Sequence, residues 1–160
     1  MPRVGLGYDV HPFGGAGPLI LGGVEIAEAE SGLAGHSDGD AVAHAVADAL
    51  LGAAGLGDLG SAFPADDPAL AGADSMRLLE QVVSMVLEAG WVLGNVDVVV
   101  AAERPKLAAS VGEMAANLGR VLRGVPVSVK PKYGEGVGAI GRGEGIAVWA
   151  IALIAPAEGR

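Results

Sequence analysis

The sequence contains no cysteine, which excludes disulfide bonds and thiolate metal sites. This absence is typical of a reducing compartment, so we expect a cytoplasmic protein. Aromatic residues make up only 4% of the chain, and no apolar run approaches the roughly 18 residues of a membrane-spanning helix. The longest apolar run, Gly145–Ala155, is only strand-sized. The first residues lack the basic and apolar regions of a signal peptide, so we expect no membrane association.

Positive charge is also scarce. The chain has 10 lysines and arginines against 19 aspartates and glutamates, which gives a net charge of −9. Proteins that bind nucleic acid usually carry a basic face, so we expect no nucleic-acid partner. A phosphorylated small molecule would need divalent metal and a few local cations, because the overall field of the protein repels it.

The length and the apolar content limit the number of domains and indicate how the chain assembles. The 160 residues fit one domain, residues 1–160, with no internal repeat and no linker. Hydrophobic residues make up 51% of the sequence, and the mean hydropathy is +0.47. This surplus without a membrane segment favours burial between subunits, so we expect an oligomer.

The periodicity of apolar residues predicts strands and helices in a definite order. Strands are expected at 3–10, 19–26, 96–102, 126–130 and 145–154, and helices at 38–54, 74–90 and 107–122. A long loop rich in glycine, proline and aspartate covers 55–68. The order β-β-α-α-β-α-β-β predicts an α/β fold of the α+β type, a two-layer sandwich of a mixed β-sheet with helices on one face.

The stretch GLGYDVHPF carries the first candidate site. Asp9 and His11 are two residues apart on a predicted strand, so their side chains share one face. The chain has only three histidines, and His44 lies in the first predicted helix, one turn from both Asp40 and Asp48. Asp9, His11 and His44 could therefore bind a metal through three ligands and leave a fourth position open, which is the catalytic arrangement.

Each candidate also has a structural interpretation. An Asp-x-His pattern alone is a weak metal signal, and a histidine on a helix is more often a packed or capping group. His36 and Ser37 stand where a helix N-terminus could bind an anion, but they could equally cap that helix. The turn at 101–109 and the glycine-rich loop at 130–145 could bind phosphate or be ordinary connections.

Several motifs together resemble the 2-C-methyl-D-erythritol 2,4-cyclodiphosphate synthase family of the non-mevalonate isoprenoid pathway. The matching stretches are GYDVHPFG, LGGVEI, GHSDGDAVAHAVADALLGAAGLGDLGSAFP, GNVDVVVAAERPKL and GRGEGIAV. They run over essentially the whole chain, which is too short for the additional cytidylyltransferase domain of some relatives. The resemblance therefore implies a single cyclodiphosphate synthase domain of the monofunctional form.

The resemblance implies a homotrimer with its active sites at subunit interfaces. One subunit would hold Zn²⁺ through Asp9, His11 and His44, supported by Asp40 and Asp48. A second metal, Mg²⁺ or Mn²⁺, would be held by Glu135. Catalytic roles are implied for His36, Glu135 and the position of Tyr133. Substrate contacts are implied for Asp9, His11, His36, Ser37, Asp58, Leu59, Gly60, Phe63, Asp67, Ala102, Pro105, Lys106, Leu107, Ala108, Lys132, Gly134, Ala139 and Arg142.

The implied reaction is the cyclisation of 4-diphosphocytidyl-2-C-methyl-D-erythritol 2-phosphate, in which the 2-phosphate attacks the β-phosphorus and expels CMP. Family trimers also enclose an axial channel that can hold an isoprenoid diphosphate, with Arg142 and Glu144 at its polar end. The chain departs from the family at Tyr133, where a catalytic threonine is usual. Ala65 replaces a common aspartate, and Ala139 replaces an aromatic residue of the channel.

Two other functions would use the same residues. A zinc phosphodiesterase acting on a small phosphorylated metabolite would fill the open zinc position with hydroxide. A non-catalytic trimeric metabolite-binding protein would need no second metal at Glu135. The reaction product separates these alternatives from the cyclase.

Overall fold

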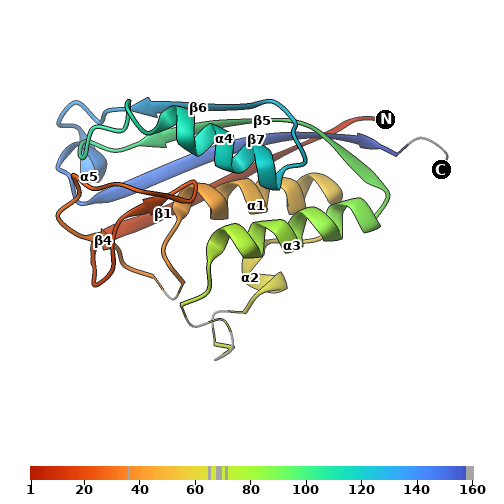
Figure 1. Cartoon of the computed structure of the whole chain (residues 1–160), viewed down its shortest axis with the longest axis horizontal. Coiled ribbons are helices and arrows are strands. Elements are labelled where there is room, and N and C mark those ends of the chain that lie inside the picture. The colour runs from red at the N-terminus through yellow and green to blue at the C-terminus, as the bar shows by residue number, and fades with distance from the viewer. Residues whose placement is uncertain (36, 65, 68–69, 71, 158–160) are drawn as a thin grey trace.

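The computed structural model describes residues 1–35, 37–64, 66–67, 70 and 72–157. A five-stranded sheet forms one layer, and the main helices form the other (Figure 1). The strands are β1 (Arg3–Gly15), β2 (Ile20–Leu21), β3 (Val24–Glu25), β4 (Gly32–Leu33), β5 (Trp91–Ala101), β6 (Val127–Lys132) and β7 (Gly145–Pro156). The helices are α1 (Ala41–Ala54), α2 (Leu59–Ala62), α3 (Ser75–Glu88), α4 (Val111–Val121) and α5 (Gly138–Gly141).

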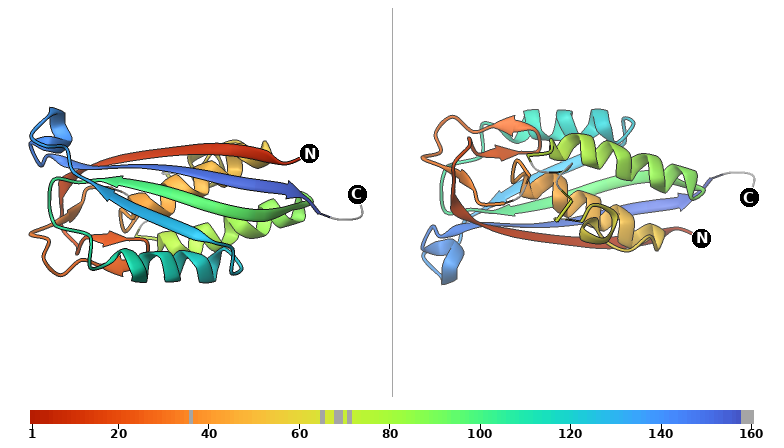
Figure 2. Two further views of the ribbon diagram at one scale, coloured as in Figure 1. Left: turned by 90° about the horizontal axis from the view of Figure 1, so that it is seen from above. Right: turned by 90° about the horizontal axis from the view of Figure 1, so that it is seen from below.

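The main sheet is mixed, as the order of elements predicted. Its strand order is β4-β1-β7-β5-β6, and the two remaining strands, β2 and β3, pair with each other. β1 runs antiparallel to β4 and β7, and β5 runs antiparallel to β7. β5 and β6 are parallel, because α4 returns the chain between them. Figure 2 shows α1, α3 and α4 on the same face of this sheet.

Small residues allow α1 to lie very close to β1. A Cβ atom added at Gly5 would lie 1.9 Å from the Ala49 carbonyl oxygen, and one added at Gly7 would lie 1.8 Å from that of Ala45. Ala45 and Ala49 are one turn apart, so they form a smooth stripe along the buried face of the helix. This close contact brings the next inward-facing residue of β1, Asp9, beside the first turns of α1.

The structure differs from the sequence prediction at several connections. The expected strand 19–26 is instead a hairpin of β2 and β3, because Gly22 and Gly23 adopt positive φ angles of 58° and 69° and turn the chain. β1 continues to Gly15, beyond its expected end at residue 10, because it keeps pairing with β7 and then with β4. The loops at 55–68 and 130–145 contain α2 and α5, which are too short to show helical periodicity.

The sheet face opposite the helices is apolar and exposed. Alternate residues of β1 and β7 point to it, with exposed fractions between 40% and 66%: Val4, Leu6, Tyr8, Val10, Trp149 and Ile151. Tyr8 and Trp149 pair across the two strands with their ring centroids 5.2 Å apart. Within the described part of the chain, no helix is long and apolar enough to cross a membrane.

Candidate metal centre and substrate pocket

Asp9, His11 and His44 meet between β1 and α1, as the sequence predicted. Asp9 Oδ2 lies 3.0 Å from His11 Nε2 and 3.0 Å from His44 Nδ1. All three donor atoms lie within 4.8 Å of one another, and this is the one group of three metal-ligating side chains among the described residues. Donors that share a tetrahedral zinc ion with bonds of 2.0–2.1 Å lie about 3.3 Å apart, so this nitrogen and oxygen set fits zinc.

The charges of the triad are mutually dependent. Burial raises the pKa of Asp9, but the hydrogen bonds from His11 and His44 outweigh it and lower this pKa to about 2. The hydrogen bond to Asp9 raises the pKa of His11, against the opposing effect of burial. His11 Nδ1 lies 2.7 Å from the Ala34 carbonyl oxygen, to which only an N–H can donate. This contact leaves Nε2 of His11 available for a metal.

The Asp9–His11 pair predicts a pH dependence of stability in the metal-free protein. The folded-state pKa of His11 lies above its ordinary value of 6.5, so its contribution is present below pH 6.5 and is lost as the pH rises through the raised pKa. The folded-state pKa of Asp9, about 2, lies below its ordinary value of 3.8, so its contribution is lost as the pH falls from 3.8 toward 2. Asp9→Asn should therefore reduce the free energy of unfolding more near about pH 5 than near about pH 9.

Urea denaturation of the metal-free protein measures this difference. Asp97→Asn is the matched control, because Asp97 pairs with Lys130 at 2.6 Å rather than with a histidine. The control should lose similar stability at both pH values. Equal losses at the two pH values for Asp9→Asn would contradict the prediction.

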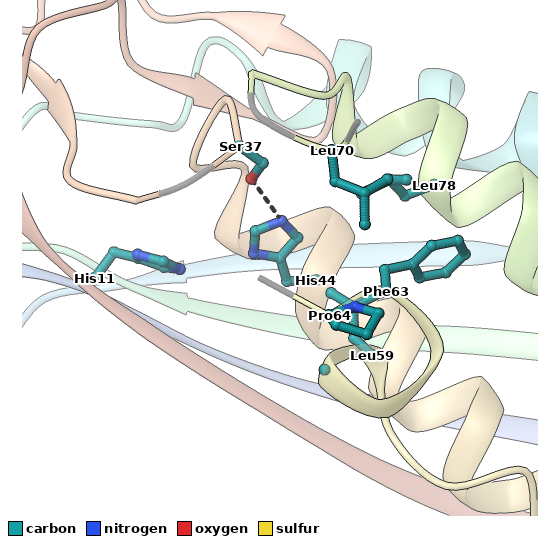
Figure 3. Close-up of a pocket in the computed structure, with 9 residues that line it drawn as sticks. His11, Ser37, His44, Leu59, Phe63, Pro64, Leu70 and Leu78 are labelled. Atoms are coloured by element: carbon teal, nitrogen blue, oxygen red, sulfur yellow. Dashed lines mark hydrogen bonds between the residues drawn. The ribbon is translucent and has the colours of Figure 1, made fainter. Parts of the chain in front are cut away.

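A cavity of about 210 Å³ opens beside the triad (Figure 3). His11, His44 and Ser37 form its polar part, and Ser37 Oγ lies 3.2 Å from His44 Nε2. The rest of the lining is provided by Leu59, Gly60, Phe63, Pro64, Leu70 and Leu78. The structure thus brings together Ser37, Leu59, Gly60 and Phe63, for which the family resemblance implies substrate contacts. Pro64, Leu70 and Leu78 were not anticipated, because apolar residues in these positions look like ordinary core residues.

Asp48 and Asp58 shape the loop that closes this cavity. Asp48 Oδ1 accepts a hydrogen bond from the Leu59 N–H at 2.7 Å and so ties α2 to α1. Burial raises the pKa of Asp48, and the Leu59 N–H opposes that rise. Asp58 caps α2 by accepting from the Ser61 N–H at 2.7 Å, and hydrogen bonds from the Ser61 side chain and then from its N–H lower the pKa of Asp58. Both carboxylates therefore position the residues that line the cavity.

Asp40 is fully buried and acts as the N-cap of α1. Its carboxylate accepts hydrogen bonds from the N–H groups of Val42 and Ala43 in the helix and of Gly22 and Gly23 in the β2–β3 turn. Burial raises the pKa of Asp40, and these N–H groups oppose the rise. The contacts fix the β2–β3 turn to the beginning of α1. The supporting role of Asp40 toward the metal stays a prediction.

The remaining predicted residues lie in two segments at the ends of β5 and β6. In the first, Ala102, Pro105 and Leu107 are buried, whereas Lys106 and Ala108 are exposed. In the second, Lys132, Tyr133, Glu135 and Ala139 are exposed, and Gly134 donates its N–H to Glu103 Oε2 at 3.0 Å. Arg142 Nε donates to Glu144 Oε1 at 2.6 Å. Asp67 is exposed and donates its N–H to the Pro64 carbonyl oxygen. His36 and Ala65 lie outside the described residues.

The fold and the site define an α/β protein with a candidate metal-dependent active site between a strand and a helix. The model of the YgbB family matches residues 2–155, and the chain belongs to this family. The family expected from the sequence is thereby confirmed.

Full-length relatives and a solved structure agree with this assignment. The 2-C-methyl-D-erythritol 2,4-cyclodiphosphate synthase of Symbiobacterium thermophilum is 52% identical over 95% of this chain and 98% of its own length. The synthase of Pectobacterium atrosepticum is 50% identical over 98% of this chain and 95% of its own. IspF of Plasmodium falciparum, solved as a CDP complex, is 32% identical, with a TM-score of 0.84 over 98% of this chain and 97% of that one.

Proposed function

We propose that this chain forms a single cyclodiphosphate synthase domain of isoprenoid precursor biosynthesis. It converts 4-diphosphocytidyl-2-C-methyl-D-erythritol 2-phosphate into 2-C-methyl-D-erythritol 2,4-cyclodiphosphate and releases CMP. The observation that carries the proposal is the Asp9, His11 and His44 triad beside a partly apolar cavity, in a chain about half identical to synthases of that name.

The metal requirement is proposed from the donor set. Asp9, His11 and His44 would hold Zn²⁺ with one position open, and Glu135 would hold Mg²⁺ or Mn²⁺. When bound, these ions supply positive charge that neutralises and orients the phosphoryl oxygens. An acidic chain with a net charge of −9 needs that attraction to bind a polyanionic substrate.

The residues of the cavity hold the methylerythritol end of the substrate. Ser37 receives its phosphate oxygens, and Leu59 and Phe63 pack against its carbon skeleton. The family resemblance implies that His36 shares the role of Ser37. Asp58, Gly60 and Asp67 complete the loop around it. Holding both phosphates in one geometry makes the attack intramolecular, and good orientation can supply about 7–11 kcal/mol of the barrier. The 2-phosphate is already largely ionised near neutral pH, so the step needs no strong general base.

The cytidine end is proposed to contact the two segments that follow β5 and β6. Ala102, Pro105, Lys106, Leu107 and Ala108 would receive the base and ribose, as in the resembling family. Lys106 and Lys132 are exposed cations that can approach the diphosphate. Gly134 lets this segment pack closely on α5, since a Cβ atom added there would lie 2.5 Å from the Gly141 nitrogen. Tyr133 offers a phenol O–H in place of a threonine hydroxyl.

The proposed assembly is a homotrimer, supported by the exposed apolar face of the sheet. Leu6 and Tyr8 of β1 pair with Ile151 and Trp149 of β7, and all four side chains are exposed on that face. A contiguous exposed apolar patch of this kind marks an interaction surface. As in the resembling family, three such faces would pack around one axis, with the cytidine segments of one subunit beside the triad of the next. The same resemblance implies an axial channel for an isoprenoid diphosphate, with Arg142 and Glu144 at its polar end and Ala139 in its lining.

Phosphorus NMR of the protein incubated with the cytidyl substrate, Zn²⁺ and Mg²⁺ tests the proposal. Two coupled resonances of a cyclic diphosphate together with CMP are the expected result. A linear product would identify a phosphodiesterase, and unchanged substrate on the zinc-loaded protein would identify a binding protein. Light scattering on the same sample should give three times the 15.8 kDa mass of the chain, and a monomer mass would contradict the proposed assembly.

A further inference from the structure

The ring of His44 has a polar contact on the side away from Asp9. Its Nδ1 atom faces Asp9, and its Nε2 atom lies 2.8 Å from Oγ of Ser75, the first residue of α3. Ser75 is only 1% exposed, so its hydroxyl group must find its hydrogen-bonding partners within the protein. No sequence pattern indicates this contact, because 31 residues separate His44 from Ser75.

The direction of the hydrogen bonds follows from Asp38. Asp38 Oδ1 lies 2.5 Å from Ser75 Oγ, and Asp38 Oδ2 accepts the backbone N–H of Ser75 at 3.0 Å. A carboxylate only accepts, so Ser75 gives its single hydroxyl hydrogen to Asp38. Only lone pairs of Oγ then remain toward His44, and Nε2 of His44 must carry the hydrogen between them.

We propose that Ser75 and Asp38 are positioning residues that orient His44 for the metal. With its hydrogen on Nε2, a neutral His44 presents the lone pair of Nδ1 to the zinc ion, as the triad requires. The two bonds from Asp38 fix Ser75, and Ser75 fixes the imidazole plane. The inference rests on the proposed zinc site. It adds the two residues that orient His44, the ligand from α1, through its Nε2 atom.

The arrangement resembles the contact behind the other histidine. His11 Nδ1 donates to the Ala34 carbonyl oxygen at 2.7 Å, so each histidine of the triad has its non-ligating nitrogen held. Ser37 Oγ is a second neighbour of His44 Nε2, but it lies farther away, at 3.2 Å, and already accepts the Gly39 N–H. Ser75 is therefore the principal partner of His44.

Zinc affinity of the purified full-length protein tests this inference through Ser75→Ala. We expect the zinc dissociation constant, measured by competition with a chromophoric chelator, to rise about 10- to 100-fold. The zinc-loaded wild type should also show a slowly exchanging imidazole N–H resonance, which Ser75→Ala should lose. Asp74→Ala is the matched control, because Asp74 caps the same helix through the Met76 and Arg77 N–H groups. This control should bind zinc within about two-fold of the wild type.

Asp38→Asn provides a second test if Ser75→Ala fails to fold. The amide keeps the shape of the side chain but loses the charge that draws the hydroxyl hydrogen, so zinc binding should weaken by about ten-fold. Unchanged zinc affinity in either folded variant, or equal weakening in Asp74→Ala, would overturn the inference. A wild type that binds no zinc would overturn the proposed metal site as well, so the two failures are distinguishable.

Discussion

Replacing His11 with alanine is expected to remove bound zinc and to lower kcat/KM for cyclisation by at least about 1,000-fold. The variant deletes one of three donors that converge on one point, with His11 Nε2 only 3.0 Å from Asp9 Oδ2. A 1,000-fold loss corresponds to about 4 kcal/mol, which is within the several kcal/mol that a metal ion supplies to charge stabilisation in phosphoryl transfer. Metal content by mass spectrometry and turnover by phosphorus NMR measure the two effects.

Chelation of the wild type provides the comparison for this variant. Removing zinc from the wild type should abolish turnover, and adding zinc back should restore it. The same addition should not rescue His11→Ala. The His11 side chain is mostly buried, at 19% exposed, and it contacts both Asp9 and the Ala34 carbonyl oxygen, so the variant should lose some stability but stay folded. A zinc content or a turnover equal to that of the wild type would refute the assignment of His11.

The triad could be predicted because it depends on local periodicity. Asp9 and His11 share a strand face at any register, and His44 lies on the helix that the apolar spacing predicted. For His44 to reach Asp9 and His11, the strand and the helix must also pack against each other. The glycines and alanines between β1 and α1 satisfy that condition.

The contacts that support the site could not be predicted in the same way. The sequence places Asp40 and Asp48 one turn from His44 on the predicted helix, and the family resemblance implies that they support the zinc site. In the structure, the carboxylate of Asp40 binds four backbone N–H groups and that of Asp48 binds the Leu59 N–H. An aspartate at a helix N-terminus satisfies backbone donors first, because burying those donors unpaired is costly.

Long-range contacts and short elements account for the other differences. Ser75 follows Asp74, where the predicted helix 74–90 begins, but its contact with His44 depends on how α3 packs on α1. The β2–β3 hairpin has two residues in each strand, so periodicity cannot separate it from one continuous strand. The positive φ angles of Gly22 and Gly23 turn the chain and so make the hairpin. These angles cannot be predicted from the sequence, because glycine adopts positive or negative φ with equal ease.

Replacing Gly7 with alanine is expected to lower the free energy of unfolding by about 3 kcal/mol or more and to weaken zinc binding. The new Cβ atom would lie 1.8 Å from the Ala45 carbonyl oxygen and 2.7 Å from the Ala49 nitrogen, so backbone rather than a flexible side chain has to move. Gly7 precedes Asp9 by two residues on the same strand face, and Ala45 follows His44 directly. Separating β1 from α1 therefore also separates two metal ligands.

Gly52→Ala on the same helix is the matched control for that prediction. Gly52 is exposed in α1, and a Cβ atom added there would have no neighbour within 4 Å. Its replacement should stabilise the chain by about 0.5–1 kcal/mol, because alanine loses less conformational entropy in a helix. Urea denaturation and zinc titration of both variants measure the contrast. If Gly7→Ala keeps the stability and zinc affinity of the wild type, close packing of β1 on α1 does not set the spacing of Asp9 and His44. If only Gly7→Ala loses stability and zinc affinity, the metal site depends on the close packing that the glycines of β1 allow.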